Sequence, residues 1–110
     1  MRMGQLLLGA FIVSFCGVVL AREERAAAVR ATRTRLALLD QAMLAYRADH
    51  DRGCPKSIQE LVTADYLKDI PLDAWGHPLQ LRCPGRRDAA GYDIFSDGPD
   101  GVNGGFDRVE

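Results

Sequence analysis

The chain has few residues that could carry acid–base or nucleophilic chemistry. Only two of its 110 residues are histidines, His50 and His77, and no serine or cysteine stands in a recognisable nucleophile motif. Its charges are also balanced, with a formal net charge of −1, so the basic excess typical of nucleic-acid-binding proteins is missing. These absences predict a protein that is not an enzyme and does not bind nucleic acid.

Long apolar runs are equally scarce. The main one, Leu6 to Ala21, is 16 residues without a charge. As an α-helix it would cover about 24 Å, short of the ~30 Å hydrocarbon core of a bilayer unless neighbouring residues extend it. Met3 to Gln5 can lengthen it at one end, and the aliphatic stem of Arg22 can do so at the other. We expect residues 1–21 to be a membrane anchor or leader region.

The segment after the apolar run has the pattern of an amphipathic helix. Leu36, Leu39, Met43 and Tyr46 recur at helical spacing. No proline or glycine interrupts residues 18–49, so the apolar run and this segment read as one continuous helix. This favours a retained anchor that leads into a spine helix over residues 22–52. A secretory signal removed after Ala21 remains the alternative.

Basic residues gather at the start of this amphipathic segment. The five arginines are Arg22, Arg25, Arg30, Arg33 and Arg35. They form either a solvated helix face, partly paired with the neighbouring glutamates, or a surface for anionic lipid headgroups.

Residues 53–110 have the signals of a small mixed head. Ser57 to Glu60 is a capping-box sequence that predicts a short helix ending near Ala64, and Gly53 is a candidate left-handed stop for the spine. Two strands are expected at 79–83 and 92–95. A two-stranded hairpin is unstable alone, so it should pack on the distal half of the spine. The expected core is Met43, Tyr46, Leu61, Leu79, Leu81, Tyr92 and Ile94, with Trp75 mostly buried.

The fold class predicted from these elements is α+β. It consists of a long N-terminal helical spine, with its first half embedded in the membrane, and a head made of a short helix and an antiparallel β-hairpin.

The three cysteines fall into two contexts. Cys16 lies in the apolar run and is best interpreted as a small hydrophobic residue. If the head is exported, Cys54 and Cys83 would form a disulfide that closes a loop of about 30 residues and contributes roughly 3–4 kcal/mol. A zinc site built from these two cysteines with His50 and His77 is the rival, although the spacing is unlike common structural zinc sets.

The C-terminal tail is rich in oxygen ligands. Its acidic and amide residues are Asp97, Asp100, Asn103, Asp107 and Glu110, and four glycines lie between them. Calcium prefers six to eight oxygens, and glycines allow a loop to wrap closely around it. The alternate-residue pattern of an EF-hand is absent. The tail is therefore a candidate calcium loop or, alternatively, a solvated acidic turn.

Several segments together resemble the major pseudopilin of type II secretion systems. They are DAWGHPLQL at residues 73–81, CPG at 83–85, YDIFSDGPDG at 92–101 and LLDQAMLAY at 38–46. The resemblance implies a pilin-like protein, single-pass in the inner membrane with a periplasmic C-terminal head. It also implies a structural subunit that assembles through its helix into a pseudopilus and so supports protein export across the outer membrane. Its partners would be other copies of itself or other pseudopilins, the inner-membrane secretion platform and the lipid bilayer.

The resemblance also assigns a calcium site in the tail. The ligands would be the backbone carbonyls of Asp97, Val102 and Gly105 and the carboxylates of Asp100 and Asp107. Family members often have a second aspartate where this chain has Arg108. A cation in that place should weaken calcium binding.

The N-terminus departs from the family pattern. Leader cleavage between Gly4 and Gln5 would leave Gln5 as the first mature residue and Gly9 as the fifth, where relatives have glutamate. The alternative function is therefore an exported, monomeric calcium-binding module released by signal peptidase. The mature N-terminus discriminates among the routes: Gln5 for pilin-like processing, Arg22 for release and Met1 for a simple anchor.

Overall fold

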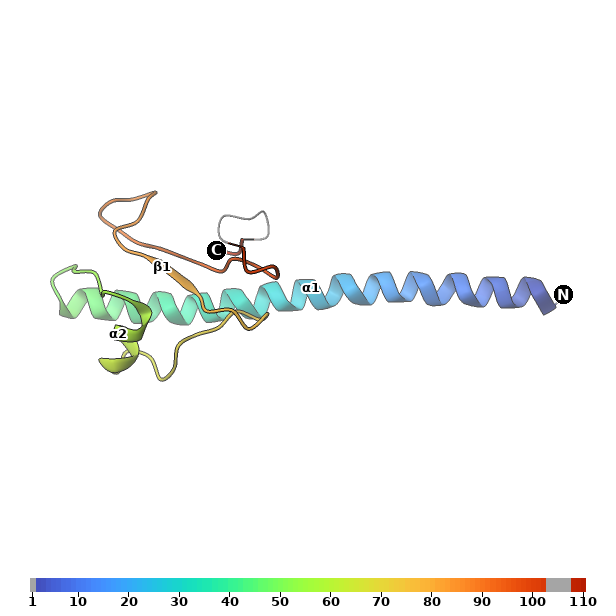
Figure 1. Cartoon of the computed structure of the whole chain (residues 1–110), viewed down its shortest axis with the longest axis horizontal. Helices are drawn as coiled ribbons and strands as arrows, with labels where there is room; N and C mark the ends of the chain where they lie inside the picture. Colours follow the sequence, from blue (N-terminus) through green and yellow to red (C-terminus); the bar gives the residue numbers. More distant parts are fainter. Residues whose placement is uncertain (1, 103–107) are drawn as a thin grey trace.

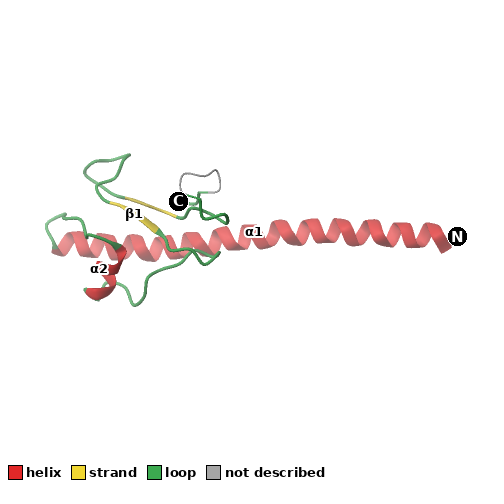
Figure 2. Ribbon diagram, viewed as in Figure 1, coloured by secondary structure: helices red, strands yellow, loops and turns green. Residues whose placement is uncertain are grey.

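The computed structural model describes residues 2–102 and 108–110, with side chains from Arg22 onward. Its elements in chain order are α1 (Arg2–Asp49), α2 (Ile58–Thr63), β1 (Gln80–Arg82) and β2 (Asp93–Phe95). The molecule measures 75 × 27 × 17 Å, because α1 is a single long rod. All other elements gather along the half of α1 that ends at Asp49 (Figures 1 and 2). The predicted pilin-like α+β fold of spine and head is confirmed.

The structure does not show the membrane-embedded part of that prediction. Within the described part of the chain, no helix is both long and apolar enough to span a bilayer. An anchor over residues 1–21 remains a prediction.

One stripe of α1 forms the core together with the head. Leu39 and Met43 on α1 and Leu61 on α2 are fully buried, and Leu79 and Val109 close the core from the hairpin side. The predicted core residues Leu81, Tyr92 and Ile94 are only partly buried, because nothing described covers the outer face of a two-stranded sheet. Trp75 is likewise partly buried and packs against the edge of the core, not in its centre.

The spine helix ends differently from the prediction. The left-handed residues are Asp51 (φ 54°) and Arg52 (φ 62°), so Gly53 is not the left-handed stop. The backbone N–H of Arg52 donates to the carbonyl of Arg47 at 2.7 Å and ends the helix. Gly53 has a different role, because a Cβ there would lie 2.9 Å from the carbonyl oxygen of His50. Glycine permits this close approach of the turning chain.

The start of α2 also differs from the capping box that the sequence predicts. Ser57 makes no side-chain capping bond. Glu60 instead accepts hydrogen bonds from the backbone N–H of Lys56 and from the hydroxyl of Tyr46. The glutamate thus fastens α2 both to the chain before it and to the spine.

The hairpin pairs antiparallel in the register Gln80↔Phe95, Leu81↔Ile94 and Arg82↔Asp93. Its strands are shorter than the sequence predicts. An isolated bridge, Ser96↔Val109, lies beyond β2 and returns the end of the chain to the sheet. The predicted disulfide between Cys54 and Cys83 is present, with the two Cα atoms 5.7 Å apart. Because both sulfurs are used in this bond, the rival zinc site is not formed.

Candidate functional site

A buried carboxylate stands where the turn before β1, the end of β2 and the spine meet. Asp73 is 1% exposed. Its Oδ1 accepts the backbone N–H groups of Trp75 at 3.0 Å and His77 at 2.9 Å. Its Oδ2 accepts the hydroxyl of Ser96 at 2.6 Å. Three donors on two segments therefore satisfy one buried charge, which makes burial of that charge tolerable.

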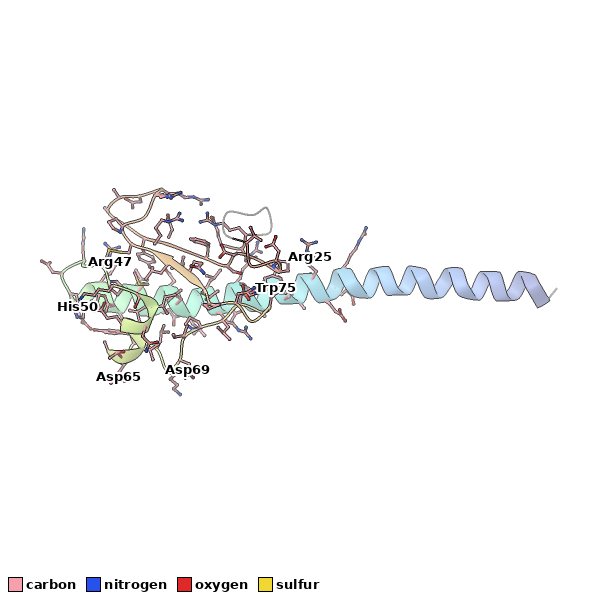
Figure 3. All side chains as sticks on the ribbon, viewed as in Figure 1. Arg25, Arg47, His50, Asp65, Asp69 and Trp75 are labelled. Carbon is pink, nitrogen blue, oxygen red and sulfur yellow. A yellow bond between two sulfur atoms is a disulfide. The ribbon has the colours of Figure 1, made fainter. Side chains whose placement is uncertain are left out.

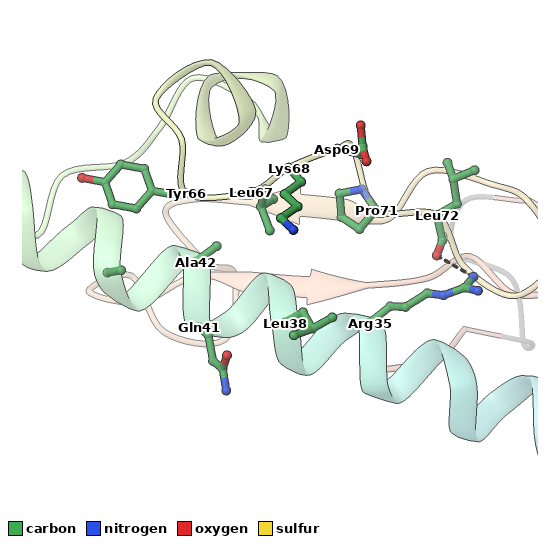
Figure 4. A pocket seen from close by; sticks show the side chains of 11 residues that line it. Arg35, Leu38, Gln41, Ala42, Tyr66, Leu67, Lys68, Asp69, Pro71 and Leu72 are labelled. Atoms are coloured by element: carbon green, nitrogen blue, oxygen red, sulfur yellow. Dashed lines mark hydrogen bonds between the residues drawn. The ribbon is translucent and has the colours of Figure 1, made fainter.

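The spine holds the same turn from the other side. Thr32, fully buried on α1, accepts the backbone N–H of Ala74 at 3.1 Å. Arg35 donates to the carbonyls of Leu72 at 3.0 Å and Asp73 at 2.8 Å, and the first of these bonds is drawn in Figure 4. The position of the turn along the spine is thus set by side chains one helical turn apart.

The network continues into the loop that follows β2. The Ser96 hydroxyl, which donates to Asp73, also accepts the backbone N–H of Gly98 at 3.1 Å. Further along, Gly101 has φ +67°, and a Cβ there would lie 3.1 Å from Nε2 of His77. The left-handed backbone and the close approach both require glycine. The candidate calcium loop is therefore built directly onto the Asp73 network.

The predicted calcium ligands are only partly brought together. Asp97 is 6% exposed, and its Oδ1 is buried without a hydrogen-bond partner among the described residues. The Asp100 carboxylate is exposed and accepts the N–H of Val102, which is itself exposed. Gly105 and Asp107 lie outside the described residues. Over residues 22–102 and 108–110, no group of three acidic, histidine or cysteine side chains could hold a metal ion.

A buried, unpartnered carboxylate oxygen nevertheless has the chemistry of a cation ligand. The Asp97 carboxylate is therefore compatible with a nearby calcium ion. Calcium binding remains a prediction.

Arg108 is partly buried near the end of the chain. Its guanidinium lies over the ring of Phe95, 3.8 Å from the ring centroid, and its NH2 lies 2.9 Å from Glu110. Arg82 approaches the same ring at 5.3 Å. Sequence analysis missed this arrangement, which buries Phe95 under two arginines.

Aromatic and acidic side chains meet at the far tip of the spine, where Figure 3 labels His50 and Arg47. The rings of Tyr46 and His50 stack with centroids 3.9 Å apart, and Tyr66 approaches Tyr46 edge-on at 5.5 Å. The Tyr66 hydroxyl donates to Asp49 at 2.6 Å. The backbone hydrogen bond from Lys56 lowers the pKa of Glu60, and the Tyr46 hydroxyl acts in the same direction. These contacts fix the tip of the head to the spine.

One face of the spine helix carries exposed apolar side chains, and the sequence did not identify it as functional. Two leucines on it are more than half exposed, Leu38 at 55% and Leu44 at 57%. Beside it runs a groove of about 650 Å³ between α1 and residues 66–72. Leu38, Ala42 and Leu72 are among the residues lining it (Figure 4). The signal was present in the sequence, because both leucines lie off the core stripe of the helix.

The proposed leader junction between Gly4 and Gln5 lies within α1, in the part whose side chains are not described. Leader cleavage between Gly4 and Gln5 remains a prediction.

Comparison with known proteins identifies the family. The family model for type II secretion system (T2SS) protein G matches residues 19–110. The type II secretion system core protein G of Pseudomonas aeruginosa PAO1 is 45% identical over 43 residues, which are 39% of this chain and 29% of that protein. This match thus spans less than a third of the relative's length. No solved structure matches the chain. Because the family model covers most of the chain, including the whole head, the chain belongs to the T2SS protein G family.

Proposed function

We propose that this protein is a structural subunit of a type II secretion pseudopilus and assembles with other copies of itself or with other pseudopilins. The observation that carries the proposal is the outward face of α1. It keeps two leucines exposed along a helix that extends well beyond the head (Figure 1). Exposed apolar surface on a rigid helix is typical of a protein–protein contact. The family match supports the same conclusion.

The head suits a periplasmic location. Its disulfide is of the kind that persists in oxidising compartments. In the proposed arrangement residues 1–21 anchor the chain in the inner membrane as a single pass, next to the secretion platform. The head then packs on the outside of the helix assembly. The protein serves as a mechanical element, and its side chains position one another instead of acting on a substrate.

We also propose calcium as a ligand of the loop after β2. The buried, unpartnered Oδ1 of Asp97 supports this proposal. By the family resemblance, the Asp97, Val102 and Gly105 carbonyls and the Asp100 and Asp107 carboxylates would hold the ion, and the Asp97 carboxylate would add a negative charge beside it. Calcium would offset the negative charge of Asp97 and Asp100 and stabilise the loop on the Asp73 network.

Deleting the gene in the host and restoring it tests the proposed function. We expect type II substrates to accumulate in the periplasm of the deletion strain, and export to return with the wild-type chain. Unchanged export in the deletion strain would contradict the proposal.

Membrane fractionation with N-terminal sequencing of the mature chain separates the proposal from the rival function. A membrane-bound chain that begins at Gln5 or Met1 supports the anchored subunit. A soluble periplasmic chain that begins at Arg22 supports the released calcium-binding module.

A further inference from the structure

We propose that one face of α1, called here the arginine face, binds the phosphate groups of anionic phospholipids at the membrane surface from which the spine emerges. The face consists of four exposed residues, Arg22, Arg25, Arg30 and Arg33. They border a shallow hollow of about 410 Å³, which Ala26 and Val29 also line. The inference rests on the proposed function, because it requires that residues 1–21 anchor the chain in the bilayer.

The helix brings the four arginines to one side of the spine. At 100° per residue they cover about 140° of the circumference of α1. Glu24 lies on the opposite side of the helix, and Glu23 lies at the edge of the face, beside Arg30. Between residues 22 and 33, therefore, no acidic residue stands within the arginine face.

The sequence gives these arginines no acidic partner along the helix. Side chains meet on a helix surface at spacings of three and four residues, and none of the four has an aspartate or glutamate at those spacings. Instead, Arg22 is three residues from Arg25, and Arg30 is three residues from Arg33. Like charges at such spacings destabilise a helix, so an external anion would relieve both pairs. Among the described residues, Arg22, Arg30 and Arg33 form no ion pair.

The arginine face ends where the head begins. The next basic residue, Arg35, donates to the carbonyls of Leu72 and Asp73 and holds the head to the spine. Arg25 lies where α1 leaves the head and continues toward its N-terminus (Figure 3). The face thus occupies the length of α1 between the predicted anchor and the head.

This position matches the headgroup layer of an anchored chain. At 1.5 Å per residue, Arg22 lies about 2 Å and Arg25 about 6 Å beyond Ala21 along the axis. The headgroup layer is roughly 5–8 Å thick on each side of the hydrocarbon core, so both arginines fall within it. The Cα–Cβ bonds of a helix tilt toward its N-terminus, which here directs the side chains toward the membrane.

Arg30 and Arg33 form a second tier, about 14 and 18 Å beyond Ala21. They stand outside the headgroup layer. Electrostatic attraction is screened over about 8–10 Å at moderate ionic strength, so this tier adds a weaker attraction to the same surface.

Phosphate is the ligand that suits a row of guanidinium groups, because the planar fork of arginine matches phosphate oxygens. In phosphatidylcholine, the choline cation cancels the phosphate charge, whereas phosphatidylglycerol keeps a net negative charge. Basic residues beside a membrane anchor therefore select the anionic lipid. An acidic protein segment is the competing partner, and the location at the membrane boundary favours the lipid.

The lipid selectivity of the full-length chain tests the inference. The chain is reconstituted into phosphatidylcholine vesicles that contain a trace of spin-labelled phosphatidylglycerol or spin-labelled phosphatidylcholine. The motionally restricted fraction of each label measures its contact with the protein. We expect the phosphatidylglycerol label to be enriched several-fold over the phosphatidylcholine label, and high salt to weaken this enrichment. Equal restricted fractions for the two labels would overturn the inference.

Substitutions identify the residues responsible. Arg22→Gln should lower the enrichment by up to about fivefold, as expected for one basic residue at an anionic surface, and Arg33→Gln should lower it less. Arg22→Lys should keep most of the enrichment, because it retains the charge. The matched control is Arg86→Gln, which removes one charge from an exposed position between the strands and should change nothing. Equal losses with Arg22→Gln and Arg86→Gln would refute the arginine face.

The source of the anion is tested separately. Millimolar inorganic phosphate should leave the enrichment the same as chloride of equal ionic strength does. Loss of enrichment in phosphate alone would assign the face to free phosphate. Equal label fractions in vesicles, together with weaker cross-linking of Arg22→Gln to other proteins in cells, would assign it to an acidic protein segment. Either result would overturn the lipid assignment.

The inference and the proposed function can fail independently. Flotation with the vesicles first shows insertion, and a chain that does not float would refute the anchor that both require. If the chain floats and selects phosphatidylglycerol while gene deletion leaves export intact, the lipid contact stands and the proposed function is wrong. If export depends on the chain but the two labels are equally restricted, the proposed function survives and the lipid contact is wrong.

Discussion

Asp73 anchors the turn before β1, and replacing it with asparagine isolates the contribution of its charge. The substitution preserves shape and leaves one oxygen for the N–H groups of Trp75 and His77. The new amide group would instead face the Ser96 hydroxyl. Ser96 already accepts the N–H of Gly98, so its oxygen meets a second donor and the short bond from Ser96 to the carboxylate is lost.

The expected loss of stability follows from the type of bond. A hydrogen bond to a charged group contributes roughly 1.5–3 kcal/mol, so Asp73→Asn should lower the free energy of unfolding by about 2 kcal/mol. Asp73→Ala leaves three donors without their acceptor and should cost more than 3 kcal/mol. Small domains have only about 5–15 kcal/mol in total, so the alanine variant should be close to unfolding.

Urea unfolding of the full chain in mild detergent measures this loss. Fluorescence reports directly on the site, because the single tryptophan, Trp75, donates its backbone N–H to Asp73. The matched control is Asp69→Asn, which removes one charge from an exposed position in the same connection. It should change stability by less than about 0.5 kcal/mol. Equal midpoints for Asp73→Asn and Asp69→Asn would refute the claim that the buried network holds the turn.

Three further outcomes are expected. Reducing the Cys54–Cys83 disulfide should lower the stability of the head by roughly 3–4 kcal/mol in thermal melts, and an unchanged melting temperature would contradict this. The lowered pKa of Glu60, due mainly to the Lys56 N–H, means that its contribution is present above the pKa of an unfolded glutamate and is lost as the pH falls through the folded pKa. Glu60→Gln should therefore flatten the acid limb of the stability–pH curve, and an unaltered limb would show that another group controls it. If calcium binds the folded loop, millimolar calcium should raise the melting temperature relative to EDTA, and Arg108→Asp should enlarge that shift. Identical melts for both chains would remove the calcium proposal.

The elements and one covalent link could be predicted because their signals are local or compositional. Apolar residues at helical spacing, with no glycine or proline from 18 to 49, predicted the spine. Alternation between turn residues predicted the hairpin, and two cysteines in an exported head predicted the disulfide. Each of these rests on a pattern within one segment or on residue type alone.

The buried polar network could not be predicted in the same way. Thr32, Asp73 and Ser96 come from three segments, and their hydrogen bonds join residues 23 to 42 positions apart. Locally, Asp73 looks like an ordinary turn aspartate and Ser96 like a loop serine. Similarly, Phe95 is buried by two arginines, which sequence patterns class as exposed residues.

Of the candidate sites, the calcium loop was recognised through its resemblance to a family, whereas the exposed face of α1 that carries Leu38 and Leu44 was overlooked. Leu38 and Leu44 were visible in the sequence, off the core stripe of the spine helix. Only the structure shows that the head leaves them exposed.

Export by a chain that carries Leu44→Arg tests the central claim, assembly through the face of α1 on which Leu38 and Leu44 are exposed, most directly. Leu44 is 57% exposed, so the substitution should leave the head folded, with its disulfide intact, while placing a charge in the proposed contact. Gln59→Arg, which adds the same charge at an exposed position on α2, serves as the control. In the deletion strain, the account predicts that the control restores secretion of type II substrates and that Leu44→Arg does not. Full secretion with Leu44→Arg, at wild-type protein levels, would contradict it.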